Sequence, residues 1–137
     1  MSSVHLSLDF HSGVPIYLQI VEQIQELVLN GELIPGDQLP TVRQLAAEIR
    51  VNFNTVARAY RMLDEARLIS TQQGRGTYIL NLPGTEFKHK IKTASLDVQL
   101  KRALQALVKQ GYDQEEIRTE LDLILNQKNI QEIDEEG

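Results

Sequence analysis

The chain of 137 residues contains no cysteine and no tryptophan. Without cysteine it has no disulfide framework, no thiol nucleophile and no thiolate zinc site. Its histidines, His5, His11 and His89, stand apart from one another. No stretch approaches the roughly 18 apolar residues of a membrane span, and the first residues lack the basic and apolar regions of a signal peptide. We therefore expect a cytoplasmic protein that does not associate with membranes and binds no metal or cofactor.

Positive charge is also scarce, since the formal net charge is −5. Residues 1–40 have no lysine or arginine and five acidic residues, and residues 83–137 have eight basic and eleven acidic residues. Residues 41–82 instead carry six arginines against three acidic residues. Arginine makes bidentate contacts to phosphate and guanine, so this segment predicts a surface for an anionic partner. A merely solvated face is the alternative, and charge alone does not separate the two.

Hydrophobic periodicity predicts three helices before residue 67. The first runs from Pro15 to a C-cap at Gly31, the second covers about 41–49 with Thr41 as its cap, and the third follows Asn52 to about Ala66. We expect the Asn52 side chain to accept a hydrogen bond from the backbone of Thr55. The third helix has an apolar face of Val56, Ala59, Tyr60, Leu63 and Ala66 and an outer face of Asn54, Arg58, Arg61 and Glu65.

Shorter segments predict strands and loops around these helices. The alternation of apolar residues over 4–10 predicts a short strand, and the two prolines of 33–40 predict an ordered loop. Residues 68–72 and 77–80 predict a β-hairpin with glycines at its tip. Residues 83–93 predict a linker.

Two amphipathic helices are predicted in the C-terminal part, up to Gly111 and from Asp113 onward, and an acidic frayed tail follows them. Asp113 and Glu116 have the spacing of a capping box. Two helices of this size do not bury their apolar stripes alone, so we expect them to pack on the first domain or on another subunit. The residues predicted to form a dimer contact are Leu100, Leu104, Leu107, Ile117, Leu121 and Ile124.

These elements predict a mainly α fold with a small β-hairpin. A winged helix-turn-helix domain is expected over residues 1–82, a linker over 83–93 and a helical dimerisation region over 94–137.

Residues 15–79 resemble the DNA-binding domain of the GntR family of bacterial transcription regulators. The resemblance rests on GELIPGDQLP at 31–40, RQLA at 43–46, NTV at 54–56 and GRG at 74–76, in that order. The short tail of about two helices resembles the YtrA-type subfamily. The resemblance implies a DNA-binding regulator and no enzymatic activity.

The resemblance assigns DNA contacts to the second helix, to the start of the third helix and to the wing. Arg58 is our candidate for reading guanine, and Arg61 for contacting phosphate. Some of these residues also have an alternative role in the fold instead of in DNA binding. Asn52 caps the third helix, and Gly74 and Gly76 form the turn of the hairpin. Arg61 is four residues before Glu65, with which it can form an ion pair. The predicted DNA-binding residues are Arg43, Asn52, Asn54, Thr55, Arg58, Arg61, Gln73, Gly74 and Arg75.

Three positions depart from the family pattern. Arg50 and Arg67 stand where the family has glycine, and Arg50 occupies a turn expected to need positive φ. Phe53 stands where proline or a polar residue is common; its alternatives are contact with a thymine methyl group or packing beside the second helix, and we favour packing.

We therefore expect a homodimeric repressor that binds a palindromic DNA operator. YtrA-type regulators often lie beside transporter genes, so the resemblance also implies control of a transporter operon. The alternative is a winged-helix module that binds an acidic protein instead of specific DNA. The sequence identifies no small-molecule effector, and we expect no dedicated effector pocket.

Overall fold

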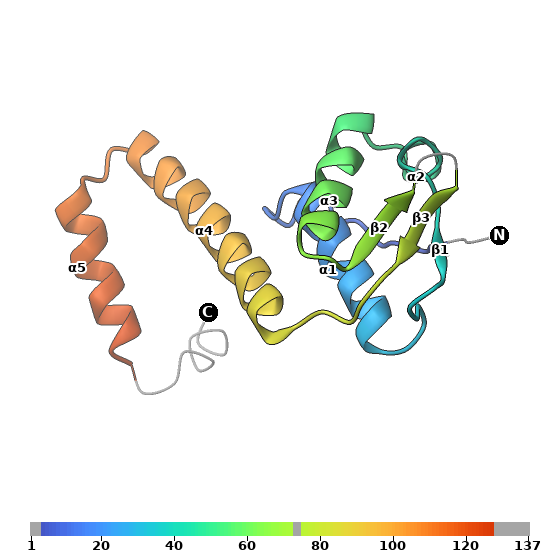
Figure 1. Cartoon of the computed structure of the whole chain (residues 1–137). Helices are drawn as coiled ribbons and strands as arrows, with labels where there is room; N and C mark the ends of the chain where they lie inside the picture. Colours follow the sequence, from blue (N-terminus) through green and yellow to red (C-terminus); the bar gives the residue numbers. More distant parts are fainter. Residues whose placement is uncertain (1–3, 73–74, 128–137) are drawn as a thin grey trace. The chain divides into compact units, whose positions relative to one another are not determined.

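The computed structural model describes residues 4–72 and 75–127. It divides into two units, residues 1–99 and 100–137 (Figure 1). In the described ranges, none of the helices combines the length and apolar character needed to cross a membrane.

Unit 1 is built on three helices, α1 (Ile16–Leu29), α2 (Val42–Ile49) and α3 (Phe53–Glu65). Both α1 and α2 pack against α3. The predicted inner face of α3 is confirmed, because Val56, Ala59, Tyr60 and Leu63 are buried and Ala66 is partly buried. From α1, the buried apolar residues are Leu18, Ile20, Val21, Ile24 and Val28.

The starts of α2 and α3 are fixed by capping side chains. Thr41 accepts a hydrogen bond from the Gln44 backbone N–H at 3.0 Å, and Gln44 Oε1 accepts one from Thr41 N–H at 2.9 Å. Asn52 is the N-cap of α3 as predicted, but its side chain accepts from Asn54 N–H at 2.7 Å. The expected partner, the Thr55 N–H, instead donates to the Asn52 carbonyl at 3.0 Å.

A three-stranded antiparallel sheet completes the winged domain, with strand order β1 (Gln38–Leu39), β3 (Gly76–Ile79), β2 (Ile69–Gln72). The predicted hairpin is confirmed, with Ser70 opposite Tyr78. The prediction of a loop at 33–40 missed β1, which pairs with β3. Leu39, Ile69 and Ile79 turn their side chains into the core.

The predicted strand over residues 4–10 is wrong. These residues form no strand, although their alternation is visible in the burial of Val4 and the partial burial of Leu6 and Leu8. Side chains of α1 take the place of a neighbouring strand. Gln19 Oε1 accepts from Asp9 N–H at 2.8 Å and its amide group donates to the Asp9 carbonyl at 2.7 Å. Gln23 holds the backbone of Ser7 in the same way.

The predicted linker over 83–93 is also wrong, because helix α4 (Thr85–Lys109) begins within it. Ile91 is buried in the core of unit 1 and Phe87 packs against that core. Lys88, Lys90 and Lys92 are exposed. The prediction rested on these charged residues and overlooked the apolar residues between and before them.

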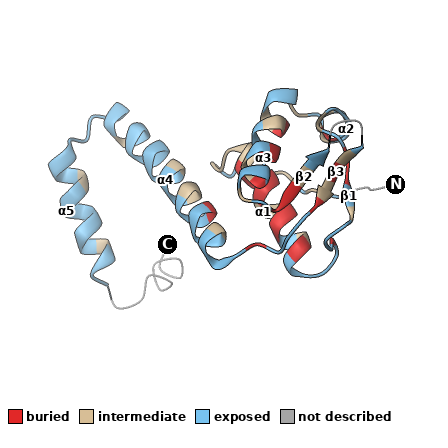
Figure 2. Cartoon of the chain, viewed as in Figure 1, coloured by how far each residue is buried: buried red, intermediate tan, exposed pale blue. Residues whose placement is uncertain are grey.

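Unit 2 contains the last part of α4 and helix α5 (Gln114–Leu125). The capping box is confirmed, since Asp113 accepts from Glu116 N–H at 2.8 Å and Glu116 accepts from Asp113 N–H at 3.0 Å. None of the described residues of this unit is buried, in contrast to α1, α3 and the sheet (Figure 2). The expected acidic tail lies outside the described residues.

Replacing Gln19 should loosen the attachment of the N-terminal segment. Gln19 is 7% exposed, and its amide group also donates to the Val14 carbonyl at 2.9 Å. Gln19→Ala leaves these backbone groups without partners, so we expect the free energy of unfolding in urea to fall by about 1–3 kcal/mol.

Gln23→Ala is the matched control. Gln23 makes the same pair of bonds at a more exposed position, so its loss should be below about 1 kcal/mol. Equal losses for the two variants would contradict the assignment of the Gln19 effect to burial.

Candidate nucleic-acid interface

The outer face of α3 is exposed as the sequence predicts. Asn54, Arg58, Arg61 and Glu65 lie on it, and Thr55 is partly buried beside them. Within residues 4–72 and 75–127, no carboxylate lies within ion-pair distance of Arg61, so the alternative of a pair with Glu65 is not realised. Arg43, Arg58 and Arg75 are likewise without a carboxylate partner in this part of the chain. The face therefore offers unneutralised guanidinium groups.

Arg58 has an aromatic neighbour from another helix. Its guanidinium carbon lies 3.7 Å from the centroid of the Tyr17 ring, at the start of α1. At this distance the ring attracts the cation through its quadrupole. The first helix contains none of the predicted DNA-binding residues, so Tyr17 is a site residue that sequence reasoning missed.

A groove of about 800 Å³ lies between α3 and the wing. Arg61 lines it from α3, and Thr71, Gln72 and Arg75 line it from the hairpin. Asp64 lines it as well, and is its one described carboxylate. The structure thus brings Arg61 and Arg75 to one groove, whereas Arg43 and Arg58 are exposed outside its lining.

The wing is tied down through the backbone of Arg75. Its carbonyl accepts from the Tyr78 hydroxyl at 2.7 Å and from the Gln38 amide group at 3.5 Å. Gly76 adopts φ +105°, a conformation that favours glycine, and a Cβ atom there would lie 2.6 Å from Gln38 Nε2, so the end of the Gln38 side chain would have to move away from Arg75. Sequence reasoning missed Gln38, whose role depends on strand β1, and Tyr78, whose hydroxyl bonds back to a carbonyl three residues earlier. The predicted contacts Gln73 and Gly74 lie outside the described residues.

A buried hydroxyl group fixes the chain just before α2. Tyr60, on the inner face of α3, donates its hydroxyl to the Pro40 carbonyl at 2.7 Å. Burial, together with the charge of Glu48, raises the pKa of Tyr60, so the hydroxyl stays a donor. The hydrogen bond holds the N-terminal end of α2 against α3. The exposed Arg43 lies in the first turn of α2.

Two arginines bracket α3 in left-handed backbone conformations. Arg50 has φ +55° and Arg67 has φ +64°. The prediction that Arg50 occupies a turn of positive φ is therefore confirmed, and Arg67 does the same. Phe53, expected to pack, is 49% exposed at the first position of α3.

Comparison with known proteins agrees with the winged helix-turn-helix fold described above. Residues 16–79 match the family model described as "Bacterial regulatory proteins, gntR family". The chain is 50% identical to the HTH-type transcriptional repressor YtrA of Bacillus subtilis over 74 residues, which are 54% of this chain and 57% of that protein. It is 37% identical to the transcriptional regulator YhcF of Bacillus subtilis over 74% of this chain and 79% of that protein.

Solved structures are similar over the winged domain and over the whole chain. A transcriptional antiterminator from Listeria monocytogenes is 34% identical, with a TM-score of 0.58 over 94% of this chain and 95% of that one. The DNA-binding domain of AraR in complex with operator ORX1 is 27% identical, with a TM-score of 0.50 over 56% of this chain and 99% of that one. The mainly α winged-helix fold predicted from the sequence is thus confirmed.

Arg50 offers a test of the strained turn. Because glycine adopts φ +55° at little cost, Arg50→Gly should raise the free energy of unfolding by about 0.5–1 kcal/mol. The midpoint of urea denaturation measures the change.

Ala47→Gly is the control, since Ala47 is exposed within the regular part of the same helix. There glycine should lower stability by about 0.5–1 kcal/mol. Two changes of the same sign would show that the backbone conformation of Arg50 does not set its effect.

Proposed function

Since this chain belongs to the GntR family and is a DNA-binding transcription regulator, not an enzyme, we propose that it represses transcription as a homodimer on a palindromic operator. The observation that carries the proposal is the outer face of α3, where Arg58 and Arg61 are exposed without carboxylate partners in the described chain. The protein would act in the cytoplasm.

In this proposal α3 enters the major groove of DNA. Its N-terminal residues Asn54 and Thr55 contact base edges or phosphate, and Arg58 reads guanine with its in-plane donors. Arg61 contacts the phosphate backbone, and Arg75, which lines the same groove between α3 and the wing, reaches the minor groove with the wing tip. Arg43 adds a contact from α2, Asn52 one from the cap of α3, and Gln73 and Gly74 bring the wing tip to the minor groove.

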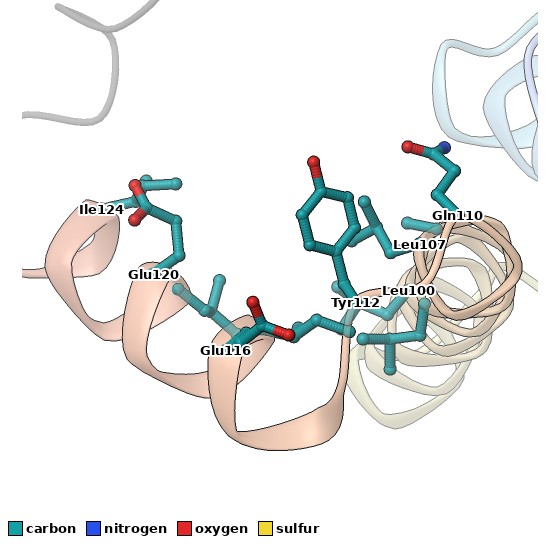
Figure 3. Close-up of a pocket in the computed structure, with 11 residues that line it drawn as sticks. Leu100, Leu107, Gln110, Tyr112, Glu116, Glu120 and Ile124 are labelled. Carbon is teal, nitrogen blue, oxygen red and sulfur yellow. The ribbon is translucent and has the colours of Figure 1, made fainter.

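Unit 2 supports the proposed dimer by what it leaves exposed. Leu100, Leu104 and Leu121 are 48%, 42% and 42% exposed, and no described residue of the unit is buried. A groove of about 590 Å³ between α4 and α5 is lined by all six residues predicted for the dimer contact (Figure 3). A helix pair with this much exposed apolar surface is stabilised by covering it, and a second copy supplies a matching surface.

A symmetric dimer matches a symmetric operator. Two recognition helices related by a twofold axis meet half-sites separated by about 10 base pairs or a multiple of that. The similarity to a named repressor supports repression, and the resemblance to YtrA-type regulators supports a transporter operon as the target.

Selection of bound sequences from a random DNA pool tests this function. We expect the full chain to enrich an inverted repeat with half-sites about 10 base pairs apart. Arg58→Ala should enrich the same repeat with one guanine position randomised and should weaken operator binding by about 5- to 150-fold. Gel shifts at fixed salt measure the affinities.

Arg118→Ala is the control for loss of one positive charge. Arg118 lies in unit 2 beside Glu115, and its replacement should change neither the selected sequence nor the affinity by more than about twofold. Failure of the wild-type chain to enrich any sequence would favour the protein-interaction module.

The dimer contact is tested by placing a charge in the unit 2 groove. Leu121→Glu replaces an apolar side chain by a carboxylate in a groove that already contains Glu116 and Glu120, so sedimentation velocity should show a monomer where the wild type is a dimer. Operator affinity should fall by about 100-fold or more, because two linked half-site contacts become independent.

Leu123→Glu is matched in helix and in residue type. Leu123 is 60% exposed and does not line the groove, so this variant should remain a dimer with full operator affinity. A dimer in both variants would place the subunit contact elsewhere.

A further inference from the structure

We infer that Tyr17, from α1, is a specificity-determining residue that positions the Arg58 guanidinium for base readout without contacting the base itself. The inference rests on the proposed role of Arg58 in reading guanine. It starts from the 3.7 Å distance between the Arg58 guanidinium carbon and the Tyr17 ring centroid. This pair links the recognition helix to a helix that carries none of the predicted DNA contacts.

Stacking and base pairing use different parts of the guanidinium group. The tyrosine ring attracts the cation over its face, so one face of the planar group is covered. Guanine O6 and N7 are bound by N–H groups at the edge, in the guanidinium plane. Tyr17 therefore restrains the orientation of the group while its hydrogen-bonding edge stays available to DNA.

The core beneath Tyr17 and Arg58 fixes the two helices that carry them. Tyr17 is partly buried and packs against the core, to which α1 contributes Ile20 and Ile24 and α3 contributes Ala59. All three are at most 1% exposed. Because the two helices share this core, the ring is held in place relative to the Arg58 backbone.

Nothing on the described face competes for the Arg58 side chain. No described carboxylate lies within ion-pair distance of it, so its charge is not neutralised before DNA arrives. A free arginine side chain loses rotamer entropy when it is fixed. A side chain already restrained by stacking loses less on binding, and the difference appears as affinity and as discrimination at one base.

The Tyr17 hydroxyl makes no hydrogen bond to any described residue, which provides a conservative variant. Tyr17→Phe keeps an aromatic face over Arg58, whereas Tyr17→Leu keeps apolar packing and removes the π face. We expect Tyr17→Leu to weaken operator binding by about 3- to 10-fold and to reduce discrimination at the guanine assigned to Arg58. Tyr17→Phe should keep the wild-type discrimination.

A double-mutant cycle on the full-length chain separates positioning from simple support. Fluorescence anisotropy with the selected operator and with a guanine-substituted operator gives affinities for wild type, Tyr17→Leu, Arg58→Ala and the double variant. Positioning predicts that Tyr17→Leu changes discrimination only when Arg58 is present. An equal loss in both backgrounds, or unchanged discrimination in Tyr17→Leu, would overturn the inference.

The Arg58→Ala arm reports on the proposed function separately. Unchanged base preference in Arg58→Ala would remove the role of Arg58 and the inference with it. A changed preference there, with no effect of Tyr17→Leu, would overturn only the inference. Without DNA, the Arg58 Nε–H resonance in NMR spectra should be shifted upfield by the ring in wild type and Tyr17→Phe, and not in Tyr17→Leu.

Discussion

The packing of α1 against α3 is the contact on which the rest of unit 1 depends. Both helices contribute residues to one core, in which Ile20 from α1 and Ala59 from α3 are completely buried. Because α3 is fixed from the inside, its outer face can be devoted to polar and charged residues. The same contact brings Tyr17 to Arg58 and holds Tyr60 where it bonds the Pro40 carbonyl before α2. One apolar interface thus sets the position of the recognition helix and of two groups around it.

The features predicted well from the sequence are those with a local cause. The two faces of α3 follow from helical periodicity, the cap at Thr41 from its residue type, and the capping box at Asp113 from residues three positions apart. The positive φ at Arg50 follows from a turn between two short helices. Each of these depends on groups within one or two turns of the chain, so the order of residues carries enough information.

The features that were missed have partners far along the chain. The alternation at residues 4–10 is real, but it is satisfied by side chains of α1, Gln19 and Gln23, ten to sixteen residues later. Strand β1 forms only because β3, nearly forty residues on, lies beside it. Tyr17 stacks on Arg58 only because α1 and α3 pack together. In α4, the basic run Lys88-His89-Lys90 and Lys92 suggested a solvated linker, although Ile91 within it is buried in the core.

The short first strand also limits how the domain meets other copies of itself. β1 and β2 are the two edges of the sheet, and β1 has only two residues before Pro40, which has no N–H to donate. An edge this short presents few unpaired backbone groups, so it is a poor template for adding a strand from another chain. This edge of the sheet is thereby protected from edge-to-edge aggregation.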